Sequence, residues 1–267
     1  MTASRLTLAD GAELAVHVDG TGPDLMLVTG LGGTASFWDP TLPGLTKHFR
    51  VIRFDQRAIA ASTRGTARTD IAQLGRDSDA VLDHVGSKRA LLLGHSTGGV
   101  ILQSMALDSE SRISGLILSG TWARPNRYMA ELFGSRLKVL AVAPREYSAM
   151  VGFLGYTADW LNANWDQFEL MLAAAPVTPA QQAVVAERIR AILEFDRSAD
   201  LHKITLPTLV QGAEDDAIVP AFLNRELAGL IKHARLEMFP TGGHMYPITR
   251  TDAFVAAIVK FAHSCKW

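Results

Sequence analysis

The stretch "LLLGHSTGGVIL", Leu91 to Leu102, is an apolar run that breaks at Gly-His-Ser-Thr-Gly-Gly and then resumes. Gly94 and Gly98 lie two residues before and two residues after Ser96, which is the G-x-S-x-G pattern of a nucleophile elbow. Such an elbow joins a strand to a helix so tightly that the serine backbone is strained and its neighbours must be small. The stretch therefore predicts a buried strand, a helix, and Ser96 between them as a nucleophile. The alternative is a purely structural corner.

Apolar runs on both sides of this stretch indicate a parallel sheet. The runs are residues 24–30, 49–55, 89–94, 113–120, 207–212 and 235–240, and helical stretches lie between most of them. Nearly continuous apolar runs are typical of strands that are covered on both faces. The opening residues alternate on either side of "ADG", residues 9–11, which predicts a hairpin. We expect an α/β fold.

The alternation of strands and helices stops in the middle of the chain. From about Trp122 to Ala199 there is no strand-like run, and helical patterns cover residues 128–142, 158–173 and 179–195. We therefore predict a core domain made of residues 1–121 and 200–267, with a helical cap, residues 122–199, inserted in it.

Composition limits the classes of function. The 267 residues carry a formal net charge of −1, with 48% hydrophobic and 20% charged residues, so there is no basic footprint for nucleic acid. No run reaches the roughly 18 apolar residues of a spanning helix, and the N-terminus lacks the pattern of a signal peptide. The single cysteine, Cys265, allows neither an internal disulfide nor a Cys-rich metal site. We expect a cytoplasmic monomer or homodimer with no membrane partner.

A serine hydroxyl becomes a nucleophile only when a base removes its proton and an acid holds that base. His244 follows two glycines in "FPTGGHMYP" and is the candidate base. The loop after residues 207–212, "AEDDAIVP", offers the acids Glu214, Asp215 and Asp216. Asp216 is favoured by its spacing to Pro220, and Asp215 is the alternative. Either aspartate is also suited to cap the helix that follows.

An oxyanion hole needs two backbone N–H groups aimed at the alkoxide that forms during the reaction. Thr97 follows the candidate nucleophile at a helix N-terminus and supplies one. The second is expected from the loop "TGLGGTASFW", with Leu31 as the candidate.

These residues make the chain resemble α/β-hydrolase-fold serine hydrolases over essentially its whole length. The resemblance rests on "GLGG", "FDQR", "GHSTGG", "DAIVP" and "GGH". It is greatest to the branch that contains oxoadipate enol-lactonases and aminoacrylate hydrolases, which "TWARPN", "YTADW" and "ADLHKITLP" also resemble. The resemblance implies a mostly parallel eight-stranded sheet flanked by helices, the Ser96, His244 and Asp216 triad, and no cofactor or metal.

Two positions depart from the pattern of that family. Ala58 and Ala60 occupy glycine positions in "DQRAIAAS", and because alanine tolerates positive φ poorly, we expect this turn to differ locally. Thr29 stands where the family commonly has a histidine before the glycine of the oxyanion loop, so what braces that loop is left open.

Several residues of the helical insertion are candidates for binding substrate. Trp122, Arg124, Tyr128 and Trp160 are the candidates, together with Trp165. Arg124 is the best candidate for a substrate carboxylate because a guanidinium pairs with it through two hydrogen bonds. Core packing of the aromatic residues and a surface ion pair of Arg124 are the alternatives. We interpret His95 as a packed neighbour of the nucleophile and "ERIRAILEFDR", residues 187–197, as a solvated helix face.

The sequence thus predicts a cofactor-free serine hydrolase that cleaves a small carboxylic ester, lactone, enol-lactone or activated amide or enamine-type metabolite. A purely structural or interaction protein would have little reason to keep this set of residues. Two further alternatives remain. One is a non-acylating enzyme on the same fold: a carbon–carbon hydrolase, lyase, perhydrolase or cofactor-independent dioxygenase. Burst kinetics distinguish it from acyl transfer. The other is a small-molecule receptor derived from a hydrolase, which would bind tightly with negligible turnover.

Overall fold

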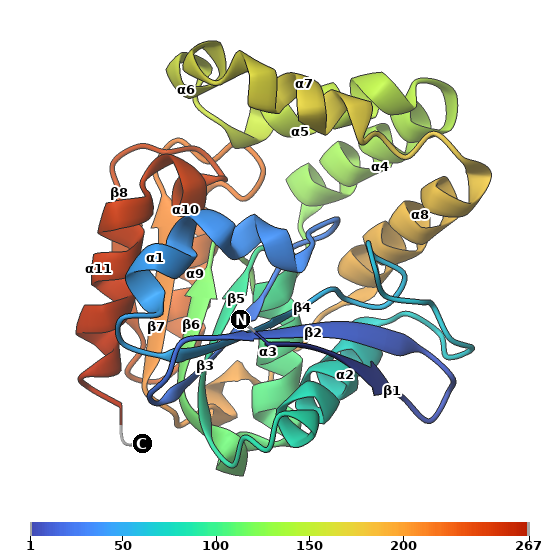
Figure 1. Cartoon of the computed structure of the whole chain (residues 1–267). Coiled ribbons are helices and arrows are strands. Elements are labelled where there is room, and N and C mark those ends of the chain that lie inside the picture. Colours follow the sequence, from blue (N-terminus) through green and yellow to red (C-terminus); the bar gives the residue numbers. More distant parts are fainter. Residues whose placement is uncertain (1, 266–267) are drawn as a thin grey trace.

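The computed structural model describes residues 2–265, and an eight-stranded sheet runs through its centre (Figure 1). The strands are β1 (Thr2–Thr7), β2 (Glu13–Asp19), β3 (Asp24–Val28), β4 (Arg50–Phe54), β5 (Ala90–His95), β6 (Ile113–Ser119), β7 (Thr208–Ala213) and β8 (Arg235–Phe239). Their order is β1-β2-β4-β3-β5-β6-β7-β8. Strand β2 runs antiparallel to both of its neighbours, and β4, β3, β5, β6, β7 and β8 pair in parallel. The predicted mostly parallel sheet and opening hairpin are confirmed.

Alternate residues of each central strand pack on opposite faces of the sheet. One hydrophobic cluster contains Met26, Ile52 and Leu92, and a second contains Leu25, Val51 and Leu91. The first cluster includes buried residues of α2 (Ile71–His84), α3 (Thr97–Asp108) and α9 (Ala221–Leu230); the second includes those of η1 (Ala35–Thr41), α1 (Leu42–Leu45), α10 (Tyr246–Thr249) and α11 (Thr251–Ala262). Helices therefore cover both faces, which is why the strands are apolar along their whole length.

Five α-helices occupy the chain between β6 and β7. They are α4 (Arg127–Val142), α5 (Pro144–Gly155), α6 (Ala158–Ala163), α7 (Trp165–Ala173) and α8 (Pro179–Glu194). Figure 1 shows them over one end of the sheet, and we refer to residues 122–199 as the helical segment. Within residues 2–265, no helix combines the length and apolarity needed to cross a membrane.

The sequence predicted one helix over residues 158–173, and that prediction is wrong in one respect. Asn164 has non-helical backbone angles, φ −124° and ψ 38°, and its side-chain amide donates to the Trp160 carbonyl at 2.8 Å. This local hydrogen bond competes with helix continuation and separates α6 from α7. Helix α5 was not predicted from the sequence. It begins at Pro144, at a position where the missing N–H of proline costs nothing.

The turn after β4 contradicts the expectation that its alanines would change the local backbone. Ala58 and Ala60 adopt φ values of 64° and 47°, the left-handed region that favours glycine. Backbone hydrogen bonds hold them there: the Ala58 N–H donates to the Thr63 carbonyl at 3.0 Å, and the Ala61 N–H donates to the Asp55 carboxylate at 3.2 Å. The surrounding contacts therefore impose a conformation that alanine by itself disfavours.

Candidate active site

Ser96 lies at the turn between β5 and α3, with φ 56° and ψ −121°. Gly94 and Gly98 must be glycine because backbone atoms of other residues lie very close to both. A Cβ at Gly94 would lie 2.3 Å from the Gly98 carbonyl oxygen, and a Cβ at Gly98 would lie 2.1 Å from the Val28 carbonyl oxygen. Side chains at these positions would separate the helix from the sheet. The strained serine backbone is thus a consequence of the G-x-S-x-G pattern.

His244 and Asp216 form a buried pair. Nδ1 of His244 donates to Oδ2 of Asp216 at 2.7 Å, and the other carboxylate oxygen accepts the backbone N–H groups of Ile218 and Val219 at 2.8 and 2.7 Å. Asp216 is 4% exposed and His244 is 3% exposed. Because Nδ1 keeps its proton in this hydrogen bond to the carboxylate, Nε2 is left as the nitrogen that can accept a proton.

Asp215, the alternative acid, has a different set of partners. Its carboxylate accepts from the Thr241 hydroxyl at 2.6 Å and from the N–H groups of Gly242 and Gly243 at 3.1 and 2.9 Å. Burial raises its pKa, but these hydrogen bonds outweigh burial and the pKa falls below its ordinary value. Asp215 therefore holds the loop that carries His244, whereas Asp216 contacts the imidazole itself.

His244 lies close to the elbow. Its ring centroid is 4.8 Å from that of His95, the residue before Ser96, and a Cβ at Gly120 would come within 3.5 Å of both rings. Within the described residues no hydrogen bond joins the Ser96 hydroxyl to His244. Catalytic hydrogen bonds are often long before substrate binds and tighten afterwards, so His244 stays the candidate base.

His95 is packed into the wall behind the pair. Its ring stacks on Phe37 with a centroid distance of 5.4 Å, and Nδ1 is 3.0 Å from the Ser119 hydroxyl, which also bonds Tyr246. Complete burial, and then the neighbouring His244, lower the pKa of His95 well below its ordinary value. A neutral, packed His95 agrees with the interpretation from sequence.

The backbone N–H groups predicted for the oxyanion hole are free. Thr97 is the first residue of α3, and within residues 2–265 neither its N–H nor that of Leu31 has a hydrogen-bond acceptor. A Cβ at Gly30, the residue before Leu31, would lie 3.1 Å from the Ser96 Cβ. The loop that carries Leu31 therefore passes directly beside the candidate nucleophile.

Three polar side chains brace that loop. The Thr29 hydroxyl donates to the Gly33 carbonyl at 3.1 Å, and the Gln56 amide donates to the Thr29 carbonyl at 2.7 Å. Nε of Arg188 donates to the Leu31 carbonyl at 2.6 Å, and its Nη2 donates to the Gln56 side chain. These hydrogen bonds brace the loop in this chain, which has Thr29 where the family commonly has a histidine.

Neither Gln56 nor Arg188 was predicted from the sequence as a residue of the site. Arg188 is 1% exposed, so the interpretation of residues 187–197 as a solvated face is wrong at this position. The available signal was the neighbouring Ile189 and Ile192, both fully buried, which mark an inward face of α8. Nothing in the sequence showed that an arginine would share that face.

The substrate-binding candidates of the helical segment lie in different surroundings. Trp122 is fully buried in the core, and Trp160 stacks on Tyr156 at 4.4 Å. Arg124 is exposed and pairs with Glu226 at 3.0 Å, which matches the alternative given for it above. The Tyr128 hydroxyl donates to the Ala217 carbonyl, next to Asp216.

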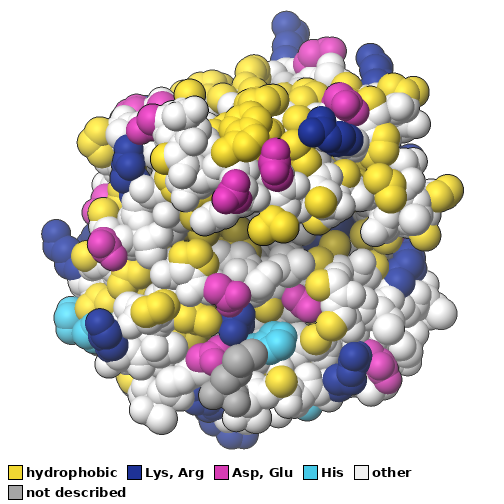
Figure 2. Space-filling model, turned by 45° about the horizontal axis from the view of Figure 1, so that its top comes forward, with side chains coloured by type: hydrophobic (Ala, Val, Ile, Leu, Met, Phe, Trp, Pro, Cys, Tyr) yellow, Lys and Arg dark blue, Asp and Glu magenta, His cyan; other side chains and the backbone are white. Residues whose placement is uncertain are grey.

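The helical segment also contacts the loop that carries His244, which we call the histidine loop. The Met245 N–H donates to the carbonyl of Gly155, the last residue of α5, at 2.8 Å, and a Cβ at Gly243 would lie 2.5 Å from the same oxygen. Figure 2 shows the surface hollowed between the upper part of the molecule and the core. Among residues 2–265, no three His, Cys, Asp or Glu side chains gather as metal ligands.

Known proteins share this architecture. A family model described as the alpha/beta hydrolase fold matches residues 23–251. The chain is 35% identical over 249 residues to a protein of Variovorax paradoxus provisionally named as a carbamate hydrolase, RutD, covering 92% of this chain and 94% of that protein. A relative in Caulobacter sp. with the same name is 34% identical, with 89% of each chain covered.

Two solved structures agree with these matches. A hydrolase from Pseudomonas aeruginosa has a TM-score of 0.86 and 31% identity, covering 97% of this chain and 98% of its own. The enol-lactonase from Burkholderia xenovorans has a TM-score of 0.88 and 26% identity, covering 97% of this chain and all of its own.

Proposed function

This chain belongs to the α/β-hydrolase fold family and is a hydrolase of that type, and from this premise we propose that it is a serine hydrolase. The observation that carries the proposal is the buried His244–Asp216 hydrogen bond of 2.7 Å beside the strained elbow at Ser96. A base oriented by a carboxylate, next to a serine in this conformation, is the arrangement that nucleophilic acyl transfer requires.

In the first half of the reaction, Nε2 of His244 takes the proton of the Ser96 hydroxyl as Oγ attacks the substrate carbonyl carbon. The carbonyl electron pair moves to its oxygen, which the Leu31 and Thr97 N–H groups stabilise. Asp216 stabilises the imidazolium that forms. His244 then gives the proton to the leaving alcohol or amine, and the bond to the leaving group breaks, leaving an acyl group on Ser96.

In the second half, His244 takes a proton from water, and the oxygen attacks the acyl carbon. Collapse of this intermediate releases the acid, and His244 returns the proton to Ser96. The net reaction consumes one water and needs no cofactor. The role of Asp215 is to fix the loop so that His244 remains within reach of the elbow.

The substrate class that we propose is a small carboxylic ester, lactone, enol-lactone, carbamate or other activated amide. The support is that similar proteins are named as a carbamate hydrolase and an enol-lactonase. We further propose that residues 122–199 form a cap over the site, because α5 contacts the histidine loop and α8 contacts the oxyanion loop.

The test is mass spectrometry of the intact protein after treatment with a fluorophosphonate. We expect one adduct on the native protein and none on Ser96→Ala or His244→Ala, because only an activated serine is labelled. A folded native protein that forms no adduct would contradict the proposal and favour a non-acylating reaction or a binding role.

Asp216→Asn and Asp215→Asn form a matched pair for a steady-state kinetic assay with an activated ester. Asparagine at 216 favours the wrong histidine tautomer, so kcat should fall by about 10⁴-fold. Asparagine at 215 loosens the loop without touching the imidazole, so the loss should not exceed about 10²-fold. Equal losses of kcat would show that the two aspartates do not have these separate roles.

A further inference from the structure

Arg188 is a buried cation that the proposed mechanism does not use. It lies on α8, is 1% exposed, and donates Nε to the Leu31 carbonyl and Nη2 to the Gln56 side chain. Both acceptors are neutral. Its third nitrogen, Nη1, is buried and has no hydrogen-bond partner within residues 2–265.

No carboxylate among the described residues forms an ion pair with Arg188. The two acids that act on it from a distance are Glu187 and Asp77. Glu187 is bonded to Arg64 and to the Thr69 N–H, and Asp77 to Arg57 and Gln73. Burial lowers the pKa of Arg188 to about 10, so the group remains charged at neutral pH. A buried charge of this kind is costly unless an anion accompanies it.

The position of this charge points to the substrate. Arg188 holds the Leu31 carbonyl, and Gly30, the adjoining residue, contacts Ser96. The guanidinium and the candidate nucleophile therefore lie against adjoining residues, Leu31 and Gly30, of the same loop. A substrate that acylates Ser96 and also carries a negatively charged group can pair that group with Arg188.

We propose that Arg188 binds a carboxylate of the substrate, so that the natural substrate is an acidic ester, lactone or carbamate rather than a neutral one. The inference rests on the proposed function and adds the substrate class to it. The free Nη1 offers two N–H donors, and a carboxylate satisfies them while it neutralises the buried charge. Arg188, rather than the exposed Arg124, thus takes the role that the sequence suggested for an arginine.

The experiment compares two esters of the same length. One is 4-nitrophenyl hydrogen glutarate, which carries a free carboxylate, and the other is its neutral methyl ester, with the adipate and pimelate pairs covering longer reach. The measured quantity is the ratio of kcat/KM for the acid to kcat/KM for the methyl ester, after subtraction of spontaneous hydrolysis. For at least one length, we expect the native enzyme to prefer the acid by about 10- to 100-fold.

Arg188→Met should abolish this preference, and Arg188→Lys should keep part of it because the charge remains. Gln56→Met loosens the same loop but leaves the charge, so it should slow both esters by a similar factor and keep the ratio. Arg190→Met, on the exposed side of α8, is the matched control and should change neither rate. A native enzyme without preference at any length, or a ratio unchanged in Arg188→Met, would overturn the proposal.

Two further readouts separate this proposal from the proposed function. Arg188→Met should still react with the fluorophosphonate, since the triad is intact. Calorimetric titration with glutarate itself needs no turnover: binding to the native protein and its loss in Arg188→Met would support the carboxylate site even if Ser96 were never labelled. The opposite result is a protein that is labelled by the fluorophosphonate and hydrolyses only neutral esters but does not bind glutarate. It would overturn the proposed carboxylate site, while the proposed serine hydrolase function would stand.

Discussion

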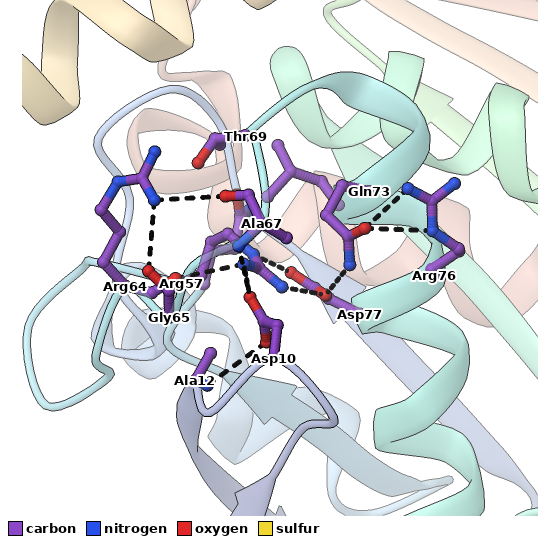
Figure 3. A network of polar contacts seen from close by, with 12 residues as sticks. Asp10, Ala12, Arg57, Arg64, Gly65, Ala67, Thr69, Gln73, Arg76 and Asp77 are labelled. Carbon is purple, nitrogen blue, oxygen red and sulfur yellow. Dashed lines mark hydrogen bonds and ion pairs between the residues drawn. The ribbon is translucent and has the colours of Figure 1, made fainter.

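Two arginines, Arg57 and Arg188, are almost completely buried, and their surroundings differ. Arg57 donates Nε and Nη2 to the two oxygens of Asp77 at 2.6 and 2.7 Å, and Nη1 to Asp10 at 2.8 Å (Figure 3). Arg188 donates only to neutral acceptors and keeps one nitrogen without a partner in the described part of the chain.

The pKa shifts of the two side chains have opposite signs for this reason. Burial lowers the pKa of Arg57, but the hydrogen bonds and charges of Asp77 and Asp10 outweigh burial and raise it. For Arg188 burial dominates, and the pKa falls to about 10. Arg57 is therefore a completed part of the fold, whereas Arg188 has charge and hydrogen-bonding capacity left for a ligand.

The largest expected difference is in stability. Arg57→Met leaves Asp77, which is 2% exposed, without its counter-ion, and should lower the free energy of unfolding by about 3–5 kcal/mol. Arg188→Met leaves two neutral acceptors unpaired but also removes an uncompensated charge, so its loss should stay below about 2 kcal/mol. Urea denaturation of both variants measures the difference.

A double variant tests whether the unpaired charge of Asp77 causes the loss of stability in Arg57→Met. Replacing Arg57 and Asp77 together, by Met and Leu, should recover much of the loss seen in Arg57→Met, because no buried charge of that pair remains. If Arg188→Met proves as destabilising as Arg57→Met, the contrast between the two arginines is not one of charge compensation.

A smaller effect is expected when the pH falls. Burial raises the pKa of Asp10, but hydrogen bonds from Arg57 and from the Ala67 and Ala12 N–H groups bring it down to about 2, against an ordinary value of 3.8. The unfolded chain then binds more protons between pH 4 and pH 2, so this contribution is present above pH 4 and is lost as the pH falls toward 2. The loss should be at most about 2 kcal/mol.

Asp10→Asn is the control for this titration. Its unfolding free energy should be lower than that of the native protein at pH 6 and should fall less between pH 4 and pH 2. A native protein and a variant with parallel pH profiles would show that Asp10 titrates alike in the folded and unfolded chains.

The smallest effect concerns the strained turn next to Arg57. An alanine with positive φ costs about 1–2 kcal/mol, while glycine costs about 0.5–1 kcal/mol in lost chain freedom. Ala58→Gly and Ala60→Gly should therefore each stabilise the protein by about 0.5–1 kcal/mol in thermal or urea unfolding. Ala61→Gly is the control, because Ala61 lies in the same turn without positive φ and its replacement should destabilise the protein instead. Equal effects at all three positions would show that positive φ is not the source of strain.

Much of the fold was predictable because its signals are local. The elbow at Ser96 follows from glycines two residues away, and the order of strands and helices follows from runs of neighbouring apolar residues. The roles of Ser96, His244 and Asp216 remain predictions, although the structure brings His244 and Asp216 into contact. The break at Asn164 and the helix α5 were missed because both depend on a few hydrogen bonds at helix ends.

The sequence by itself determined the strands, the elbow and the candidate catalytic side chains, because the pattern that marks each of them lies in a short run of consecutive residues. Only the tertiary structure decided that Asp216 faces His244 while Asp215 holds the loop, that Ala58 and Ala60 accept positive φ, and that Arg188 is buried beside Leu31. These outcomes depend on contacts between segments far apart in the chain, the last one spanning 157 residues. Burial and hydrogen bonding from such distant partners set the charge and conformation of a residue, and local sequence carries no record of them.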